Sequence, residues 1–233
     1  MGATFLTAEW RWLAMLNYRI DAGVLRPLVP AGTKLDCWRG DAIVSVVGFR
    51  FLKTRLLGLP VPFHRNFDEV NLRFYVRREV SGAVRRGVVF VREVVPRAAI
   101  ATVARWTYNE PYLACPMRSR QRPDGVRYEW RHGGRWHSLS VDVQGAPSEL
   151  EAGSEAEFIT EHYWGYTRQR DGGTVEYEVR HPRWRFWAAQ ASKLDCDVCK
   201  FYGEPFADAL AAAPCSAFLA EGSEVAVLSA KRI

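Results

Sequence analysis

The chain has 233 residues, a formal net charge of +6 and 48% hydrophobic residues. This composition excludes intrinsic disorder, and no apolar run reaches the 18 residues that a membrane-spanning helix requires. The basic residues are scattered without a block of like charge, which argues against a nucleic-acid-binding surface.

The cysteine content and the N-terminal residues predict the cellular compartment of the protein. The chain has five cysteines, and its first residues lack the basic and apolar regions of a signal peptide. Free thiols are typical of a reducing environment. We therefore expect a cytoplasmic protein that does not associate with membranes.

The first third of the chain alternates predicted strands with short breaks. Asp21 is a suitable N-cap for a short helix, and glycine and proline residues interrupt the chain after that helix. In chain order we predict a strand or an extended lead-in at 5–18, a helix at 22–28, a strand pair at 34–38 and 41–51 around Arg39-Gly40, and a loop at 52–67. A loop of this length often covers a site.

The middle of the chain has the clearest pattern. Apolar and polar residues alternate over 70–77, which is typical of a half-buried strand. A turn at Ser81-Gly82 and the β-branched run 87–95 predict a second, antiparallel strand. The alanine-rich segment 98–106 has helical spacing and predicts a short helix, and Pro111 ends any helix there.

The second half predicts further hairpins and short helices, and no boundary divides the chain. We predict a hairpin of 126–131 and 136–143 around Gly133-Gly134, a helix at 155–163 capped by Ser154, a strand at 174–181, a helix at 206–213 and a closing strand at 224–229. A single domain over 1–233 is expected.

Three motifs occur in a fixed order along residues 5–185. Residues 17–36 (NYRIDAGVLRPLVPAGTKLD) contain a Tyr-x-x-Asp strand end followed by a short helix. EVNLRFYV at 69–76 precedes a glycine turn, GVVFV and a Pro-Tyr loop, and FITEHYWGYT at 158–167 precedes His-Pro-Arg-Trp. Together these motifs resemble the YqjF-like family of unknown function (DUF2071), in the acetoacetate decarboxylase-like superfamily.

The resemblance implies a pocket but not the decarboxylase reaction. In the decarboxylases, a lysine after the proline of this loop forms a Schiff base with the substrate. The matching residue here is Tyr112, which cannot form an imine. The glutamate of the first strand corresponds to Glu69, and the carboxylate-binding arginine corresponds to Arg11.

Each pocket residue has a functional and a structural interpretation. Glu69 and Arg11 can bind and polarise a small acid, or they can form an ion pair that closes the barrel end. Tyr112 can donate a hydrogen bond or act as an acid, with Arg105 as a nearby charge, or it can simply pack. His64 is either an acid or base beside Glu69 or an exposed loop residue.

A Cys-x-x-Cys motif is the remaining candidate site. Cys196 and Cys199 have the spacing of half a zinc site or of a redox pair. No second pair of matching spacing occurs after them, so free thiols are the default expectation and metal the alternative. We predict no metal and no cofactor, because nucleotide-binding and nucleophile motifs are also missing from the sequence.

These patterns lead to one fold and two functions. We predict an α+β, mainly antiparallel β protein with an acetoacetate decarboxylase-like bent sheet or partial barrel and short helices. Arg11, Glu69 and Tyr112 should line its pocket with aromatics such as Phe74 and Trp106.

The first predicted function is non-covalent binding of a small, carboxylate-like organic ligand, with Arg105 and His64 as further contacts. The alternative is a lysine-independent lyase- or hydrolase-type enzyme, with Glu69 as acid or base and Arg11 holding a carboxylate. We expect a small molecule as partner and no nucleic acid, and homo-oligomerisation stays open.

Overall fold

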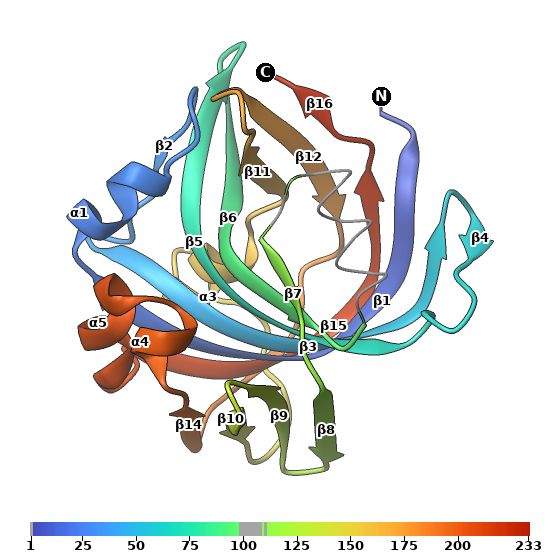
Figure 1. The fold of residues 1–233 in the computed structure, drawn as a ribbon, viewed down its shortest axis with the longest axis vertical. Coiled ribbons are helices and arrows are strands. Elements are labelled where there is room, and N and C mark those ends of the chain that lie inside the picture. Colours follow the sequence, from blue (N-terminus) through green and yellow to red (C-terminus); the bar gives the residue numbers. More distant parts are fainter. Residues whose placement is uncertain (1, 98–108, 110) are drawn as a thin grey trace.

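The computed structural model describes residues 2–97, 109 and 111–233, and these form a twelve-stranded and a four-stranded sheet with short helices (Figure 1). The large sheet contains β1 (Thr4–Ile20), β2 (Lys34–Leu35), β3 (Ala42–Leu56), β4 (Leu59–Pro60), β5 (Phe67–Val80), β6 (Ala83–Val95), β7 (Tyr112–Ala114), β11 (Trp164–Arg168), β12 (Thr174–Arg180), β13 (Phe186–Ala188), β15 (Ser216–Leu228) and β16 (Lys231–Arg232). The small sheet contains β8 (Met117–Arg122), β9 (Gly125–His132), β10 (Arg135–Asp142) and β14 (Ala191–Asp195).

The described helices are all short. They are α1 (Ala22–Leu25), α3 (Glu155–Thr160), α4 (Val198–Phe201), α5 (Ala207–Ala211) and the 3₁₀ turns Arg26–Leu28 and Glu204–Phe206. Across the described ranges, no helix has the length and apolar character needed to cross a membrane. Two helix starts are those predicted from the sequence, because Asp21 accepts a hydrogen bond from the Gly23 amide and Ser154 accepts one from Glu157.

The large sheet is strongly bent into a partial barrel, in the order β13-β15-β1-β3-β5-β6-β11-β12-β16 (Figure 1). Its long strands β1, β3, β5, β6 and β15 pair along most of their length. The hairpin β11–β12 is attached less firmly. Among the described residues, its backbone pairs with β6 at Trp164 and Gly165 and with β15 at Val179 and Arg180. We call these attachments the two short junctions. The predicted fold class is confirmed.

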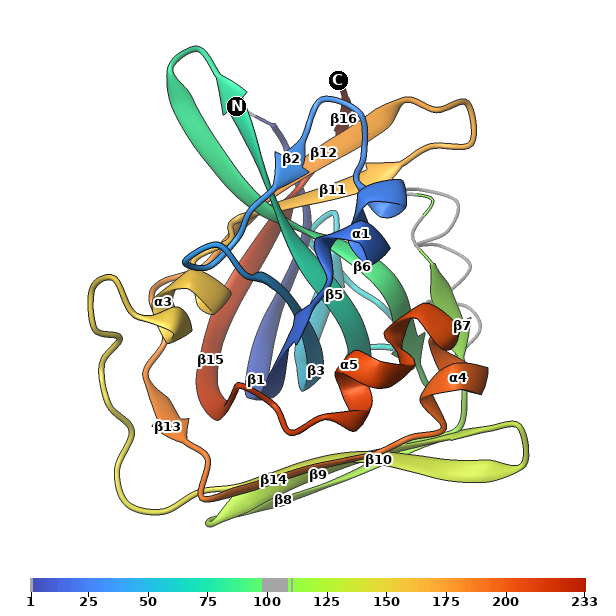
Figure 2. The ribbon, with the colours of Figure 1, turned by 90° about the vertical axis from the view of Figure 1, so that its left-hand side faces the viewer.

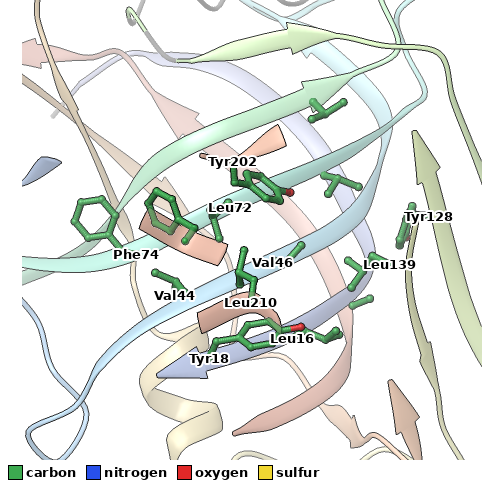
Figure 3. Close-up of a cluster of buried hydrophobic side chains, with 14 of the residues drawn as sticks. Leu16, Tyr18, Val44, Val46, Leu72, Phe74, Tyr128, Leu139, Tyr202 and Leu210 are labelled. Carbon is green, nitrogen blue, oxygen red and sulfur yellow. The ribbon is translucent and has the colours of Figure 1, made fainter. Parts of the chain in front are cut away.

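One face of the large sheet packs on the small sheet and on α4 and α5 (Figures 2 and 3). Val46, Leu72 and Phe74 lie in this core, opposite Leu210 of α5 and Tyr202 (Figure 3). Gly48 permits the close approach of the small sheet, since a Cβ there would lie 2.5 Å from the Tyr128 ring. The expectation that Phe74 lines the pocket is therefore corrected, because its side chain is buried in this core.

Most predicted elements form, with some changes. The hairpin β5–β6 turns at Ser81 and Gly82, whose positive φ values suit a tight two-residue turn. The predicted pairing of 34–38 with 41–51 is wrong, because β2 pairs with β5 and only an isolated bridge joins Trp38 to Asp41. The predicted loop 52–67 is shorter, since β3 continues to Leu56 and β4 comes next. The helix predicted at 98–106 lies outside the described residues.

Candidate functional site

A cavity of about 340 Å³ lies on the other face of the large sheet, enclosed by strands on several sides. Most of its wall is apolar and aromatic, with contributions from β1, β3, β5, β6, β11, β12 and β15. Its polar lining residues are Thr54, His64, Glu69, Asn71, Arg73, Glu93, Tyr112, Thr160, His162 and His181. A concave apolar site with a few polar groups is the usual form of a small-molecule site.

Two carboxyl groups and a phenol form a polar patch on one wall. Glu69 and Glu93 are only 2% and 1% exposed. Glu69 accepts a hydrogen bond from the Asn71 amide at 3.0 Å and one from the Tyr112 hydroxyl at 3.3 Å. Asn71 pairs with Glu93 across β5–β6, and Glu93 pairs with Tyr112 of β7. Neighbouring strands thus bring together groups that are distant in sequence.

Arg73 supplies a positive charge to the same cavity. It lies on the same face of β5 as Glu69 and Asn71, because side chains alternate along a strand. Its guanidinium donates a long hydrogen bond of 3.4 Å to the carbonyl of Ile159 and lies 5.7 Å from the Tyr75 ring. Within residues 2–97, 109 and 111–233 it forms no ion pair with a carboxylate.

His162 connects the cavity to Asp36, a buried carboxylate behind it. Its Nε2 lies 3.3 Å from Oδ2 of Asp36, which also accepts a hydrogen bond from Arg86 at 2.7 Å. Burial lowers the pKa of His162 to about 4, although the hydrogen bond to Asp36 opposes this. Burial raises the pKa of Asp36, but the hydrogen bonds from His162 and Arg86 outweigh it and the net pKa is lowered.

This histidine should make the protein sensitive to acid. The folded-state pKa of His162, about 4, lies below the unfolded value of about 6.5, so between these values the unfolded chain binds more protons. The free energy of unfolding therefore falls as the pH falls from about 6.5 towards 4. Between pH 7 and pH 5, the free energy of unfolding measured by urea titration should fall by about 2 kcal/mol more in wild type than in His162→Gln. His132→Gln, at the β9–β10 turn, should retain the wild-type loss, and an equal loss in His162→Gln would contradict the assignment.

Two other histidines line the cavity. His181 stacks on Trp184 with ring centres 4.0 Å apart, and burial lowers its pKa to about 4. His64 lies in the loop before β5, where its Nδ1 is 2.7 Å from the carbonyl of Pro62. Both rings are positioned by backbone carbonyls, since His181 makes a similar contact with Pro182 at 2.8 Å.

The structure brings some predicted site residues together and separates others. Glu69, Tyr112 and His64 all line the cavity. Arg11 does not, because its guanidinium donates to Glu9 at 3.1 Å and to the carbonyl of Gly222 at 3.1 Å. Arg105 lies outside the described residues, as do Trp106 and Glu110.

A β-bulge explains the position of Arg11. Trp12 has a left-handed backbone with φ 53°, and the pairing of β1 with β3 shifts between Arg11 and Ala14. On the C-terminal side of the bulge, Leu13 lines the cavity, and regular alternation would place Arg11 there too. The extra residue reverses the alternation, so Trp10 faces the cavity and Arg11 faces away.

Three cavity residues, Arg73, Glu93 and His162, were not predicted from the sequence. Arg73 had a usable signal, because it lies at even spacing from Glu69 on one strand. Glu93 is the only acidic residue in the run 87–95, which suggests a special environment. His162 belongs to the motif FITEHYWGYT, but the motif alone did not mark it as a cavity residue, since it reaches the cavity through tertiary packing.

None of the five lysines lines the cavity. Lys53, Lys200 and Lys231 form ion pairs with Glu9, Asp197 and Glu176, and Lys34 and Lys193 lie on β2 and β14. The cavity therefore contains no lysine amine for imine chemistry.

The Cys-x-x-Cys motif lies apart from this cavity, at the start of α4. Cys199 is exposed, and burial raises the pKa of Cys196 to about 12, which disfavours a reactive thiolate. In the part of the chain that the structure describes, no three His, Cys, Asp or Glu residues are grouped as metal ligands.

Comparison with known proteins identifies the family. The model of DUF2071, described as an uncharacterized conserved protein, matches residues 7–224. The uncharacterized protein YqjF of Bacillus subtilis (strain 168) is 27% identical over 195 residues, covering 82% of this chain and 78% of YqjF.

Solved structures show the same fold at low identity. An acetoacetate decarboxylase from Legionella pneumophila has a TM-score of 0.69 and 12% identity, over 99% of this chain and 88% of that one. The enduracididine biosynthesis enzyme MppR, complexed with pyruvate, has a TM-score of 0.65 and 14% identity, over 100% of this chain and 91% of that one. The chain therefore belongs to the DUF2071 family and has the fold of the acetoacetate decarboxylases.

Proposed function

We propose that the protein binds a small organic acid non-covalently in the cavity described above. The observation that supports this most directly is Arg73, a guanidinium in a mainly apolar cavity without a carboxylate partner among the described residues. A charge removed from water is costly unless it is paired, and an incoming carboxylate supplies two hydrogen bonds that match a guanidinium. The ligand would thus complete an ion pair.

Similarity to other proteins supports the class of ligand. MppR, which shares the fold, has been solved in complex with pyruvate, a small carboxylate. Arg73 takes the role that was predicted for Arg11 from the sequence. Because no lysine reaches the cavity, binding through contacts alone is favoured over covalent capture.

The proposal is tested by isothermal titration calorimetry with pyruvate, acetoacetate and longer monocarboxylates, each compared with its neutral amide. The acid of a pair should bind, and its amide should bind at least about tenfold more weakly, because only the acid carries the charge that complements Arg73. Equal affinity for acids and amides, or no affinity for any acid, would rule out the proposal.

An enzymatic role is the second candidate, and the hydrogen bond from Tyr112 to Glu69 favours it. A buried carboxyl beside a phenol can transfer a proton to a bound substrate, as a lyase- or hydrolase-type step requires. Glu69→Gln separates the two functions, because it keeps the shape and removes the proton-transfer group. Turnover that is lost while binding is kept would support the enzyme, and binding without any turnover in wild type would support the non-catalytic binding function.

The same proposal includes a reducing, cytoplasmic location. All five cysteines are free thiols in the structure, which suits that compartment.

A further inference from the structure

We infer that the ligand is an elongated aromatic monocarboxylic acid rather than a short keto acid. This inference rests on the proposed function and adds the chemical class of the ligand. It depends on the size of the cavity, the direction of its polar groups and the arrangement of its aromatic rings.

The cavity is too large for a short keto acid. Its volume of about 340 Å³ lies in the range of sites for drug-sized ligands. An acid of the size of pyruvate would leave most of the apolar wall in contact with water. A larger apolar body is needed to cover that wall.

The groups along β5 give the cavity a direction. Phe67, Glu69, Asn71 and Arg73 occupy every second position of the strand and all line the cavity. At about 3.3 Å per residue, the backbone of Arg73 lies roughly 13 Å from that of Glu69 and about 20 Å from that of Phe67. A carboxylate held at Arg73 therefore points its remaining atoms past the polar patch and towards an aromatic end.

That end carries a cluster of aromatic rings. Phe51 stacks on Phe67 with centroids 4.4 Å apart, and Trp10 makes edge contacts with Phe49 at 5.3 Å and with Phe51 at 5.7 Å. Trp184 closes the group at 6.5 Å from Trp10. All of these residues line the cavity.

Such a wall prefers an aromatic ligand. Aromatic rings gain from edge and offset contacts with other rings beyond the area that they bury, and an alkyl chain does not make these contacts. The Trp10 indole N–H is also buried and has no hydrogen-bond partner among the described residues. The geometry thus fits a carboxylate at Arg73, an extended linker that runs past Asn71 and Glu69, and an aryl group among the rings.

The test compares 8-phenyloctanoate and 8-(indol-3-yl)octanoate, whose linkers are long enough to pass Glu69, with pyruvate, butyrate and octanoate by isothermal titration calorimetry. The two aryl acids should bind at least about tenfold more tightly than pyruvate and butyrate, and several-fold more tightly than octanoate. Phe51→Leu should reduce the preference for aryl acids over octanoate. Phe74→Leu, in the core on the opposite face of the sheet, should keep that preference.

The possible outcomes distinguish failure of this inference from failure of the proposed binding of an organic acid. Pyruvate binding as tightly as the aryl acids, or octanoate binding more tightly, would overturn the aromatic class and leave acid binding intact. The amide of 8-phenyloctanoate binding as well as the acid would overturn both, as would the failure of every acid to bind. Should Phe51→Leu not fold, Phe49→Leu removes a ring from the same wall, and an unchanged aryl preference in it would also refute the inference.

Discussion

Replacing Arg73 by glutamine is expected to weaken the binding of a carboxylate ligand by about 100-fold, equivalent to roughly 2.7 kcal/mol. Glutamine keeps much of the length of the side chain and one amide donor, but it removes the charge. The loss should be large because the cavity wall is mainly apolar, so the ligand carboxylate would lie there without a counter-charge. Calorimetric titration of wild type and Arg73→Gln with the same acid measures the effect.

The control for this change is another arginine of the same chain. Arg11 lies on β1, but it turns away from the cavity to Glu9 and Gly222. Arg11→Gln should therefore change the affinity by less than about twofold, within the small effect of an outlying charge. An unchanged affinity in Arg73→Gln, or a comparable loss in Arg11→Gln, would show that the ligand carboxylate is held elsewhere.

Removing the carboxylate of Glu176 should cause the largest loss of stability, about 3 kcal/mol. Glu176 is fully buried on β12 and forms ion pairs with Arg78 at 2.8 Å, Arg85 at 2.5 Å and Lys231 at 3.0 Å. These partners come from β5, β6 and β16, so one carboxylate ties four strands together. In Glu176→Ala the guanidinium groups of Arg78 and Arg85 would stay charged and mostly buried without a carboxylate partner. This unpaired charge is the reason for the expected loss of stability.

Glu178→Ala is the matched control, since it removes a carboxylate two residues away on the same strand. Glu178 pairs only with Arg180 among the described residues, and both side chains are partly exposed. Removal of the Glu178 carboxylate should lower the free energy of unfolding by less than about 1 kcal/mol. Urea unfolding of both variants measures the difference, and similar free energies of unfolding would refute the role given to Glu176.

The positions of the strands were predicted better than which side of each strand faces the cavity. Alternation over 70–77 correctly located β5, but the same pattern fits a polar face in water and a polar face lining a cavity. Asn71 and Arg73 belong to the second kind. Local pattern cannot distinguish these cases, because the distinction depends on β11 and β12 covering that face from a distant part of the chain.

The candidate site was predicted only in part, because some of its predicted residues lie in regular strands and one lies beside a β-bulge. Glu69 and Tyr112 lie in regular strands, where counting along the sequence preserves the direction of side chains. Arg11 lies beside the bulge at Trp12, where counting fails by one residue. The small sheet was not predicted as a separate unit, because only its β9–β10 hairpin has a strong turn signal and β14 joins from far along the chain.

The two short junctions that hold β11–β12 have a consequence for dynamics. Strands with few ladder hydrogen bonds open locally at a lower free energy than strands paired along their length. Trp164, Tyr177 and Val179 of this hairpin are also part of the cavity wall. Opening of the hairpin at these junctions would also require the ion pairs of Glu176 with Arg78 and Arg85 to break, and it would leave β1, β3 and β5 paired. A ligand that exchanged by this route would have a residence time set by a different barrier from that of global unfolding.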